Sequence, residues 1–142
     1  MSYSGPFEDR LAIRELLETY ADAVTRRDAE AWAATWAEEA EWSLPDYPEL
    51  GTTHGRDAIK AMWIEAMKAY PGILFEAWPG TIEIAGDRAV MRSYTSEVYD
   101  RDGTTMRDRG VYEDTCVKLG GRWYFASRSF RNQHRQQTPK GC

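Results

Sequence analysis

The chain has 142 residues, which is enough for one domain with a sizeable core and too few for two. Its net charge of −5 and pI near 5.1 disfavour a nucleic-acid partner, because phosphates require a basic binding face. No apolar run approaches about 18 residues, the start lacks a signal-peptide pattern, and only two cysteines occur. We therefore expect no membrane partner and a cytoplasmic protein.

Two helices are predicted in the first part of the chain. Apolar residues over 9–25 recur at the i, i+3, i+4 and i+7 spacing of an amphipathic helix. Asp28 is a good N-cap for a second, short helix, on which Trp32 and Trp36 would share one side.

The middle of the chain combines a short strand, a loop, a helix and a bent strand. Residues 40–44 are predicted as a strand, and the 45–55 loop after it contains two prolines and two glycines. A third helix is predicted over 55–70. The strand that follows should bend at Pro79-Gly80, because proline cannot donate to the hydrogen-bond ladder.

Residues 87–132 are predicted to form three long antiparallel strands. Asp102-Gly103 and Gly120-Gly121 are turn signals between them, since both pairs tolerate the positive φ angles of tight hairpins. Everything earlier in the chain is expected to cover one face of this sheet.

The period of two along a strand divides these three strands into two faces. The expected inner set is Ala89, Met91, Ser93, Thr95, Glu97, Tyr99, Gly110, Tyr112, Asp114, Tyr124, Ala126, Arg128, Phe130 and Asn132. The expected outer set is Val90, Arg92, Tyr94, Ser96, Val98, Val111, Glu113, Thr115, Val117, Trp123, Phe125 and Ser127. Because charged and apolar residues share the inner set, we expect a sheet curled around a pocket. The apolar outer residues would form an exposed patch, so we expect a homodimer or homotrimer through that face.

Three helices followed by a mostly antiparallel sheet predict an α+β fold with the helices on one side. Strong curvature would make the sheet a cone whose open end binds a small molecule. We expect a single domain over 1–142, with residues 1–6 and 133–142 as tails.

Three segments carry a resemblance to a known family: LAIRELLETYADAVTRRDAEAWAATWAEEAEW, GTTHGRDAIKAM and RGVYEDTCVKLGGRWYFASR. Together they are similar to the SnoaL-like branch of the nuclear transport factor 2-like superfamily. The resemblance implies a cone-shaped, cystatin-like α+β barrel, cofactor-free chemistry on a bulky hydrophobic molecule, and dimers or trimers. It leaves the reaction open, because the superfamily includes dehydratases, dehydrochlorinases, ketosteroid isomerases and non-enzymatic adaptors.

The chain departs from this family at its catalytic positions. Relatives such as scytalone dehydratase and hexachlorocyclohexane dehydrochlorinase use a His base oriented by an Asp. The resemblance implies the Asp where this chain has Thr25, and the His where it has Glu76, Ala77 and Trp78, so we expect the dyad to be absent. The resemblance also places six residues at pocket-lining positions: Tyr20, Trp42, Glu97, Tyr112, Arg128 and Phe130.

Glu97 is the most informative catalytic candidate, because an ionised carboxylate on a buried face is costly unless it is paired or its pKa rises. It is either a general base or part of a structural ion pair with Arg128 or Arg92. Tyr20 and Tyr112 are either donors to a developing oxyanion or core residues with satisfied hydroxyls. Arg128 would hold an anionic substrate or intermediate.

His54 is a reserve base, since its ordinary pKa suits proton transfer, although its place before a helix suits a structural role as well. Asp46 in the same loop could orient it, and Asp114 is expected near the rim. The expected substrate-binding residues, each of which could equally belong to the core, are Trp42, Met67, Tyr70, Phe75, Trp78, Phe130 and Asn132.

Two kinds of function remain open from the sequence. The first is a cofactor-independent lyase or isomerase, of the dehydratase, double-bond isomerase or C–C lyase type, using acid-base catalysis on a bulky hydrophobic small molecule. The second is a non-catalytic ligand-binding or protein-adaptor module of the same fold. We expect no cofactor, and no metal site because His54 and His134 form no pair at ligand spacing.

Overall fold

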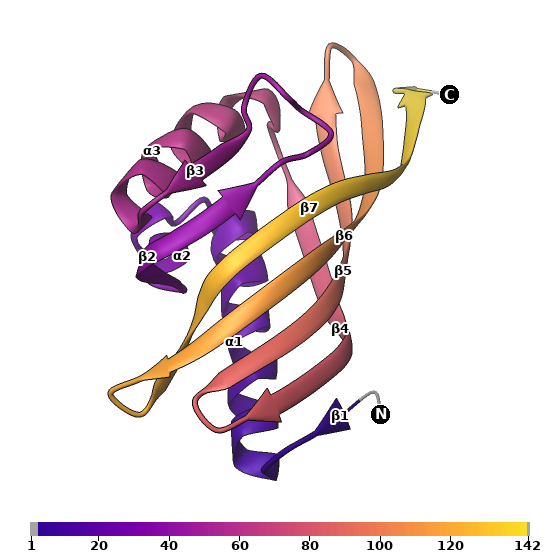
Figure 1. Ribbon diagram of the computed structural model, residues 1–142. Coiled ribbons are helices and arrows are strands. Elements are labelled where there is room, and N and C mark those ends of the chain that lie inside the picture. Colours follow the sequence, from indigo (N-terminus) through magenta and orange to yellow (C-terminus); the bar gives the residue numbers. More distant parts are fainter. Residues whose placement is uncertain (1–2, 142) are drawn as a thin grey trace.

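In the computed structural model, which describes residues 3–141, helices lie against one face of a curved sheet (Figure 1). The helices are α1 (Phe7–Arg26), α2 (Ala29–Ala33) and α3 (Arg56–Ala66), and the 3-10 turn η1 (Met67–Ala69) continues α3. The α+β class expected from the sequence is confirmed. None of the helices in this described part is both long and apolar enough to cross a membrane.

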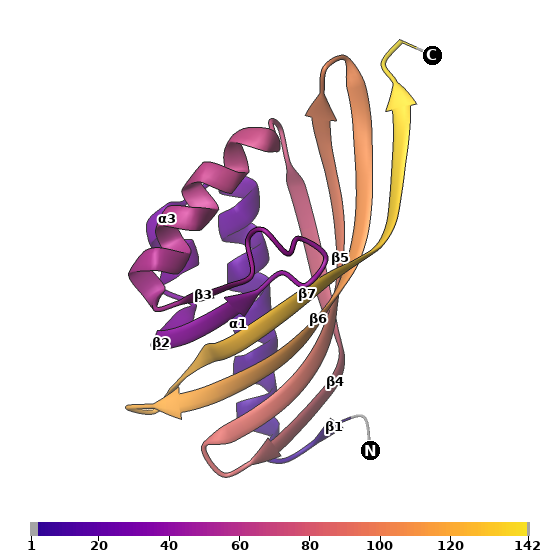
Figure 2. The same cartoon turned by 45° about the horizontal axis from the view of Figure 1, so that its top comes forward.

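The sheet is mixed and open. Its strands are β1 (Tyr3–Ser4), β2 (Trp36–Ser43), β3 (Thr52–His54), β4 (Leu74–Ala85), β5 (Arg88–Arg101), β6 (Thr104–Leu119) and β7 (Arg122–Pro139). They are ordered β1-β4-β5-β6-β7-β2-β3, with parallel pairing at β1–β4 and β2–β7 and antiparallel pairing elsewhere. Figure 2 shows the strong curvature of the long strands, with α1 lying along their concave side.

Around α2 the helix is shorter than expected, and the strand that follows it is longer. Asp28 caps α2 as predicted, because its side chain accepts a hydrogen bond from the Ala31 N–H at 3.0 Å. The helix then ends at Ala33, and Trp36 begins β2 rather than continuing the helix. Trp32 and Trp36 nevertheless contact each other, with ring centroids 5.6 Å apart, because the chain turns sharply between them.

The expected tails belong to the sheet. Residues 3–4 form β1, and residues 133–139 continue β7, while residues 1–2 and 142 lie outside the described residues. The ends of β5, β6 and β7 form a three-stranded extension that reaches beyond the helices (Figure 1). The segment 133–139 is therefore part of a paired strand rather than a tail, although its side chains are exposed.

A first β-bulge in β7 places residues 123–125 on the opposite faces of the sheet from those expected. The register between β6 and β7 shifts so that Ala126 has no partner. As a result Trp123 and Phe125 are buried in the core, and their expected place on the outer face is wrong. Tyr124, expected on the inner face, lies instead on the outer face, where its ring centroid is 5.2 Å from the Arg122 guanidinium carbon. One inserted residue exchanges the two faces for everything beyond it, which a strict period of two misses.

A second bulge in β7 affects the site. The register shifts again after Arg109, and Gln133 is left without a partner. Arg135 is thereby turned to the same side as Asp108, its partner on β6. Without this bulge, the period of two from Asn132 would direct Arg135 to the opposite face.

Candidate active site

A cavity of about 140 Å³ interrupts the aromatic core between α1, the end of α3, the 45–51 loop and the inner face of the sheet. Nine of the residues proposed from the sequence line it: Tyr20, Trp42, Met67, Tyr70, Phe75, Glu97, Tyr112, Phe130 and Asn132. The other walls are Val24, Leu44, Tyr47, Leu50, Trp63, Ala66, Ile73 and Asp108. Since a cavity of about 150 Å³ accommodates benzene, the walls enclose space for about one aromatic ring.

One end of the cavity, here called the tyrosine end, is formed by Tyr20 of α1 and Tyr112 of β6. Their hydroxyl oxygens are 3.4 Å apart, and both side chains are buried. Burial raises the pKa of both phenols, so each keeps its proton at neutral pH. One hydroxyl can donate to the other, which leaves the second hydrogen free to donate to a ligand oxygen.

Arg128 lies directly behind the tyrosine end rather than lining the cavity. Its guanidinium is 3.6 Å from the Tyr112 ring centroid and 4.4 Å from that of Tyr20. Its Nε donates to Asp114 Oδ1 at 2.7 Å, and its Nη2 donates to Ser93 Oγ at 3.0 Å. Asp114 is therefore buried beneath the site, so its expected place near the rim is wrong. Because Asp114 neutralises Arg128, the predicted role of Arg128 in holding an anion is not supported.

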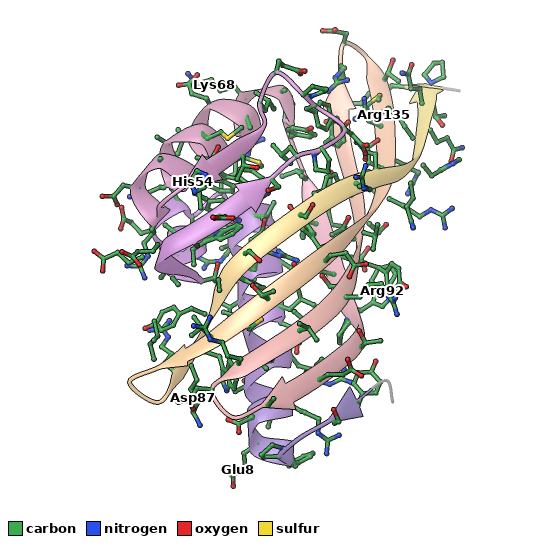
Figure 3. The ribbon with its side chains drawn as sticks, viewed as in Figure 1. Glu8, His54, Lys68, Asp87, Arg92 and Arg135 are labelled. Atoms are coloured by element: carbon green, nitrogen blue, oxygen red, sulfur yellow. The ribbon has the colours of Figure 1, made fainter. Side chains whose placement is uncertain are left out.

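The other end, here called the carboxylate end, combines Glu97 of β5 with Asp108 of β6. These two residues are direct partners across the β5–β6 ladder, and both line the cavity. Asp108 accepts hydrogen bonds from Arg135 Nε at 2.9 Å, Arg135 Nη2 at 3.0 Å and the Tyr99 hydroxyl at 2.8 Å. Glu97 pairs with neither of the arginines expected from the sequence, since Arg128 binds Asp114 and Arg92 lies on the outer face (Figure 3).

The surroundings of Glu97 favour its neutral form. The pKa of Glu97 is raised to about 8, mainly by burial and in addition by the negative charge of Asp108, while the positive charge of Arg135 opposes the rise. Burial likewise raises the pKa of the neighbouring Tyr70 to about 12, with a contribution from Glu97. The carboxylate end therefore holds one carboxylate paired with an arginine, Asp108, and one unpaired carboxyl, Glu97, whose proton is exchangeable near neutral pH.

Sequence reasoning missed Asp108 and Arg135. Asp108 is two residues before Gly110 on β6, so its side chain points to the same face as those of Gly110 and Tyr112. Extending the inner set by one step along β6 would have included it. Arg135 carried no such signal, because its inward direction depends on the bulge at Gln133.

Three residues proposed for the site lie elsewhere. The side chain of His54 is 70% exposed on β3, far from Arg135 in Figure 3, and its nearest acid is Glu41, at 3.3 Å. Asp46 does not orient His54, because it accepts a hydrogen bond from the Asn132 backbone N–H at 2.8 Å. Trp78 is 48% exposed and so forms no cavity wall.

The position expected to hold a catalytic dyad is occupied by a backbone contact. Thr25 Oγ1 accepts a hydrogen bond from the Phe75 N–H at 3.0 Å, which joins the end of α1 to β4. Phe75, not Glu76 or Trp78, is the residue of this strand that faces the cavity. Within residues 3–141, no group of three or more His, Cys, Asp or Glu side chains is placed to hold a metal ion.

Comparison with known families identifies the class of this chain. Residues 6–129 match the model of the SnoaL-like domain, and the chain belongs to that family. No curated protein matches the chain.

Solved structures share the fold along nearly the whole chain. A protein provisionally named a scytalone dehydratase, from Novosphingobium aromaticivorans DSM 12444, is 23% identical with a TM-score of 0.79, and the match covers 95% of each chain. A hexachlorocyclohexane dehydrochlorinase, LinA-type3 from Novosphingobium barchaimii LL02, is 16% identical with a TM-score of 0.82, covering 95% of this chain and 92% of that chain. A protein of the same fold from Novosphingobium aromaticivorans, described as NTF2-like with a cystatin-like fold, is 27% identical with a TM-score of 0.74, covering 87% and 80%. These likenesses support the cystatin-like fold.

Proposed function

We propose that this protein is a cofactor-independent lyase or isomerase that transfers a proton between Glu97 and a hydrophobic small molecule in the cavity. The observation that carries this proposal is the arrangement of the two ends. Glu97 has no hydrogen-bond partner within the described residues and faces a cavity with aromatic walls, and the Tyr20 and Tyr112 hydroxyls form the opposite end. Asp108 and Tyr112 are four residues apart on one strand, so the two ends are separated by about 13 Å of backbone.

The chemistry follows from this separation of roles. The ionised Glu97 carboxylate takes a proton from a C–H or O–H group of the substrate, and the electron pair left behind moves onto a substrate oxygen. The Tyr20–Tyr112 pair donates a hydrogen bond to that oxygen as its charge develops. Return of the proton to another atom gives an isomerisation, and departure of a leaving group with its electron pair gives an elimination.

The charges of the cavity favour an uncharged substrate. Its walls include two carboxyl groups, Glu97 and Asp108, whereas Arg135 is paired with Asp108 and Arg128 is paired with Asp114 behind the wall. An anionic ligand would therefore meet like charge without a free cation to compensate it. The aromatic walls match the expected hydrophobic, ring-bearing ligand, although the enclosed space suits one ring better than a large polycyclic molecule.

The proposal is tested by proton exchange, which requires no knowledge of the natural substrate. Phenylacetone carries acidic C–H bonds next to a carbonyl, and the exchange of its benzylic hydrogens in D₂O can be followed by NMR. We expect the wild-type protein to accelerate this exchange and Glu97→Gln to lower the acceleration by about 10²–10⁴. Glu76→Gln, an exposed carboxylate on the neighbouring strand, is the matched control and should behave as wild type.

A ligand-binding module without catalysis is the second candidate. It is favoured by the position of both histidines, His54 and His134, which are exposed and outside the cavity. If phenylacetone quenches the tryptophan fluorescence of the protein saturably but its hydrogens exchange at the buffer rate, this second function replaces the first.

A further inference from the structure

The two cross-strand partners Glu97 and Asp108 differ sharply in how they are held. Asp108 is 2% exposed and accepts three hydrogen bonds, two of them from the fork of Arg135 and one from Tyr99. Glu97, its neighbour on β5, accepts none from the described residues. A carboxylate that accepts from a bidentate arginine and a phenol is fixed in place by charge-assisted hydrogen bonds.

The groups around Glu97 come from every element that surrounds the carboxylate end. Asp108 faces it from β6, Arg135 from β7, Tyr70 from the segment after η1, and Tyr47 from the 45–51 loop. Among these, Asp108 carries the negative charge and Arg135 the positive one. Arg135 is closer in contact with Asp108 than with Glu97, because both of its hydrogen bonds go to Asp108.

We propose that Asp108 is a positioning residue that, anchored by Arg135 and Tyr99, directs the exchangeable proton of the carboxyl pair to Glu97. Two carboxylates facing each other on adjacent strands do not both ionise readily, and the partner that lacks hydrogen bonds retains the proton. Glu97 thus enters the reaction as the member of the pair that gains and loses the proton, and Asp108 keeps its hydrogen bonds to Arg135 and Tyr99. The catalytic meaning of this arrangement rests on the proposed function, but the arrangement itself does not.

The test is a direct titration of Glu97 in the ligand-free protein, by NMR of ¹³C-labelled glutamate side chains. In the wild type we expect the Glu97 carboxyl to titrate at about pH 8. Asp108→Asn removes the facing charge and keeps a side chain that can still accept from Tyr99 and Arg135, so the midpoint should fall by about one pH unit. Asp108→Glu, which keeps the charge, should restore a high midpoint.

Asp100→Asn is the matched control. It also removes one carboxylate charge, but on β5, three residues from Glu97 along its own strand, at an exposed pair with Lys140. The Glu97 midpoint should not move in this variant. Equal shifts in Asp100→Asn and Asp108→Asn would overturn the proposal, because they would reflect net charge rather than the facing carboxylate.

Arg135→Gln gives a second, opposite readout. Removing this cation should raise the Glu97 midpoint, whereas Asp108→Asn should lower it, and a merely structural disturbance would not produce shifts of opposite sign. This variant also decides the matter if Asp108→Asn fails to fold. An unchanged or lowered midpoint in Arg135→Gln overturns the proposal. None of these titrations involves turnover, so loss of the proposed enzymatic function would leave their outcome intact.

Discussion

Asp114 and Arg128 form an ion pair in which both side chains are fully buried, with Asp114 Oδ1 2.7 Å from Arg128 Nε. The pair lies behind the tyrosine end of the cavity, where the guanidinium also stacks on the Tyr112 ring. It thus supports the Tyr20–Tyr112 pair from below while contributing no group to the cavity surface.

Asp114→Ala should destabilise the protein strongly, because it leaves the Arg128 cation buried without a counter-charge. We expect the free energy of unfolding, measured by urea denaturation, to fall by about 3–5 kcal/mol. Asp22→Ala removes a carboxylate from the exposed Arg26–Asp22 pair and should leave the free energy of unfolding nearly unchanged. Similar losses in the two variants would show that burial of the Asp114 pair has no special energetic consequence.

Gly110 allows the ring of Phe130 to lie directly against the β6 backbone. A Cβ atom at Gly110 would be only 2.3 Å from the Phe130 ring, so Gly110→Ala must displace that ring. Because Phe130 is a cavity wall, we expect at least about a tenfold loss of affinity for an aromatic ligand such as phenylacetone, together with a stability loss of about 1–3 kcal/mol. Isothermal titration and urea denaturation measure the two effects.

Gly80 offers the control for this prediction. A Cβ there would be 2.7 Å from the ring of Tyr94, a comparable clash on the opposite face of the sheet. Gly80→Ala should therefore lose stability without losing ligand affinity. A parallel loss of affinity in both variants would mean that binding responds to stability alone, and that the Phe130 wall has no direct role.

The fold was predictable from sequence because its signals are local. The α1 periodicity, the Asp28 cap and the glycine-containing turns each depend on a few neighbouring residues. The boundary at Trp36 was not predictable in this way. A tryptophan four residues after Trp32 fits a helix face, and only the pairing of β2 with β7 makes it a strand.

The site was predictable only where side chains alternate regularly between the two faces of the sheet. Glu97, Tyr112 and Phe130 reach the cavity because no bulge separates them from the residues that set their parity. Arg135 and Phe125 lie beyond bulges, so their directions were inaccessible to a pattern argument. His54 and Trp78 are residue types suited to a site, but both side chains are exposed and neither lines the cavity.

We expect a homo-oligomer assembled through the outer face of β4 and β5. Three residues of the expected outer set are buried and take no part: Val117, Trp123 and Phe125. Leu74, Trp78 and Val90 are about half exposed on these strands, and Trp78 contacts Tyr94 there, with ring centroids 6.2 Å apart. Burying such a patch against a second copy would remove apolar surface from water. Light scattering at micromolar concentration should show a dimer or trimer.

Trp78→Glu should shift this assembly towards the monomer, because it places a charge at the centre of the contact. Phe7→Glu is the control, since Phe7 is 69% exposed on α1, away from the outer sheet face. A monomeric wild type, or an assembly that responds to Phe7→Glu and not to Trp78→Glu, would contradict the predicted interface.

Glu97 should make the stability of the protein depend on pH. Its pKa is raised from 4.5 to about 8 on folding, so between these values the folded state holds a proton that the unfolded chain releases. Its contribution to the free energy of unfolding is therefore fully present below pH 4.5 and is lost as the pH rises through about 8. Glu97→Gln resembles the protonated carboxyl and removes this dependence on pH. The Tm of the variant minus that of the wild type should therefore increase as the pH rises from about 5 to about 9. Glu76→Gln, at an exposed site, should run parallel to the wild type, and a Glu97→Gln curve that also runs parallel would show that Glu97 is ionised in the folded protein at neutral pH.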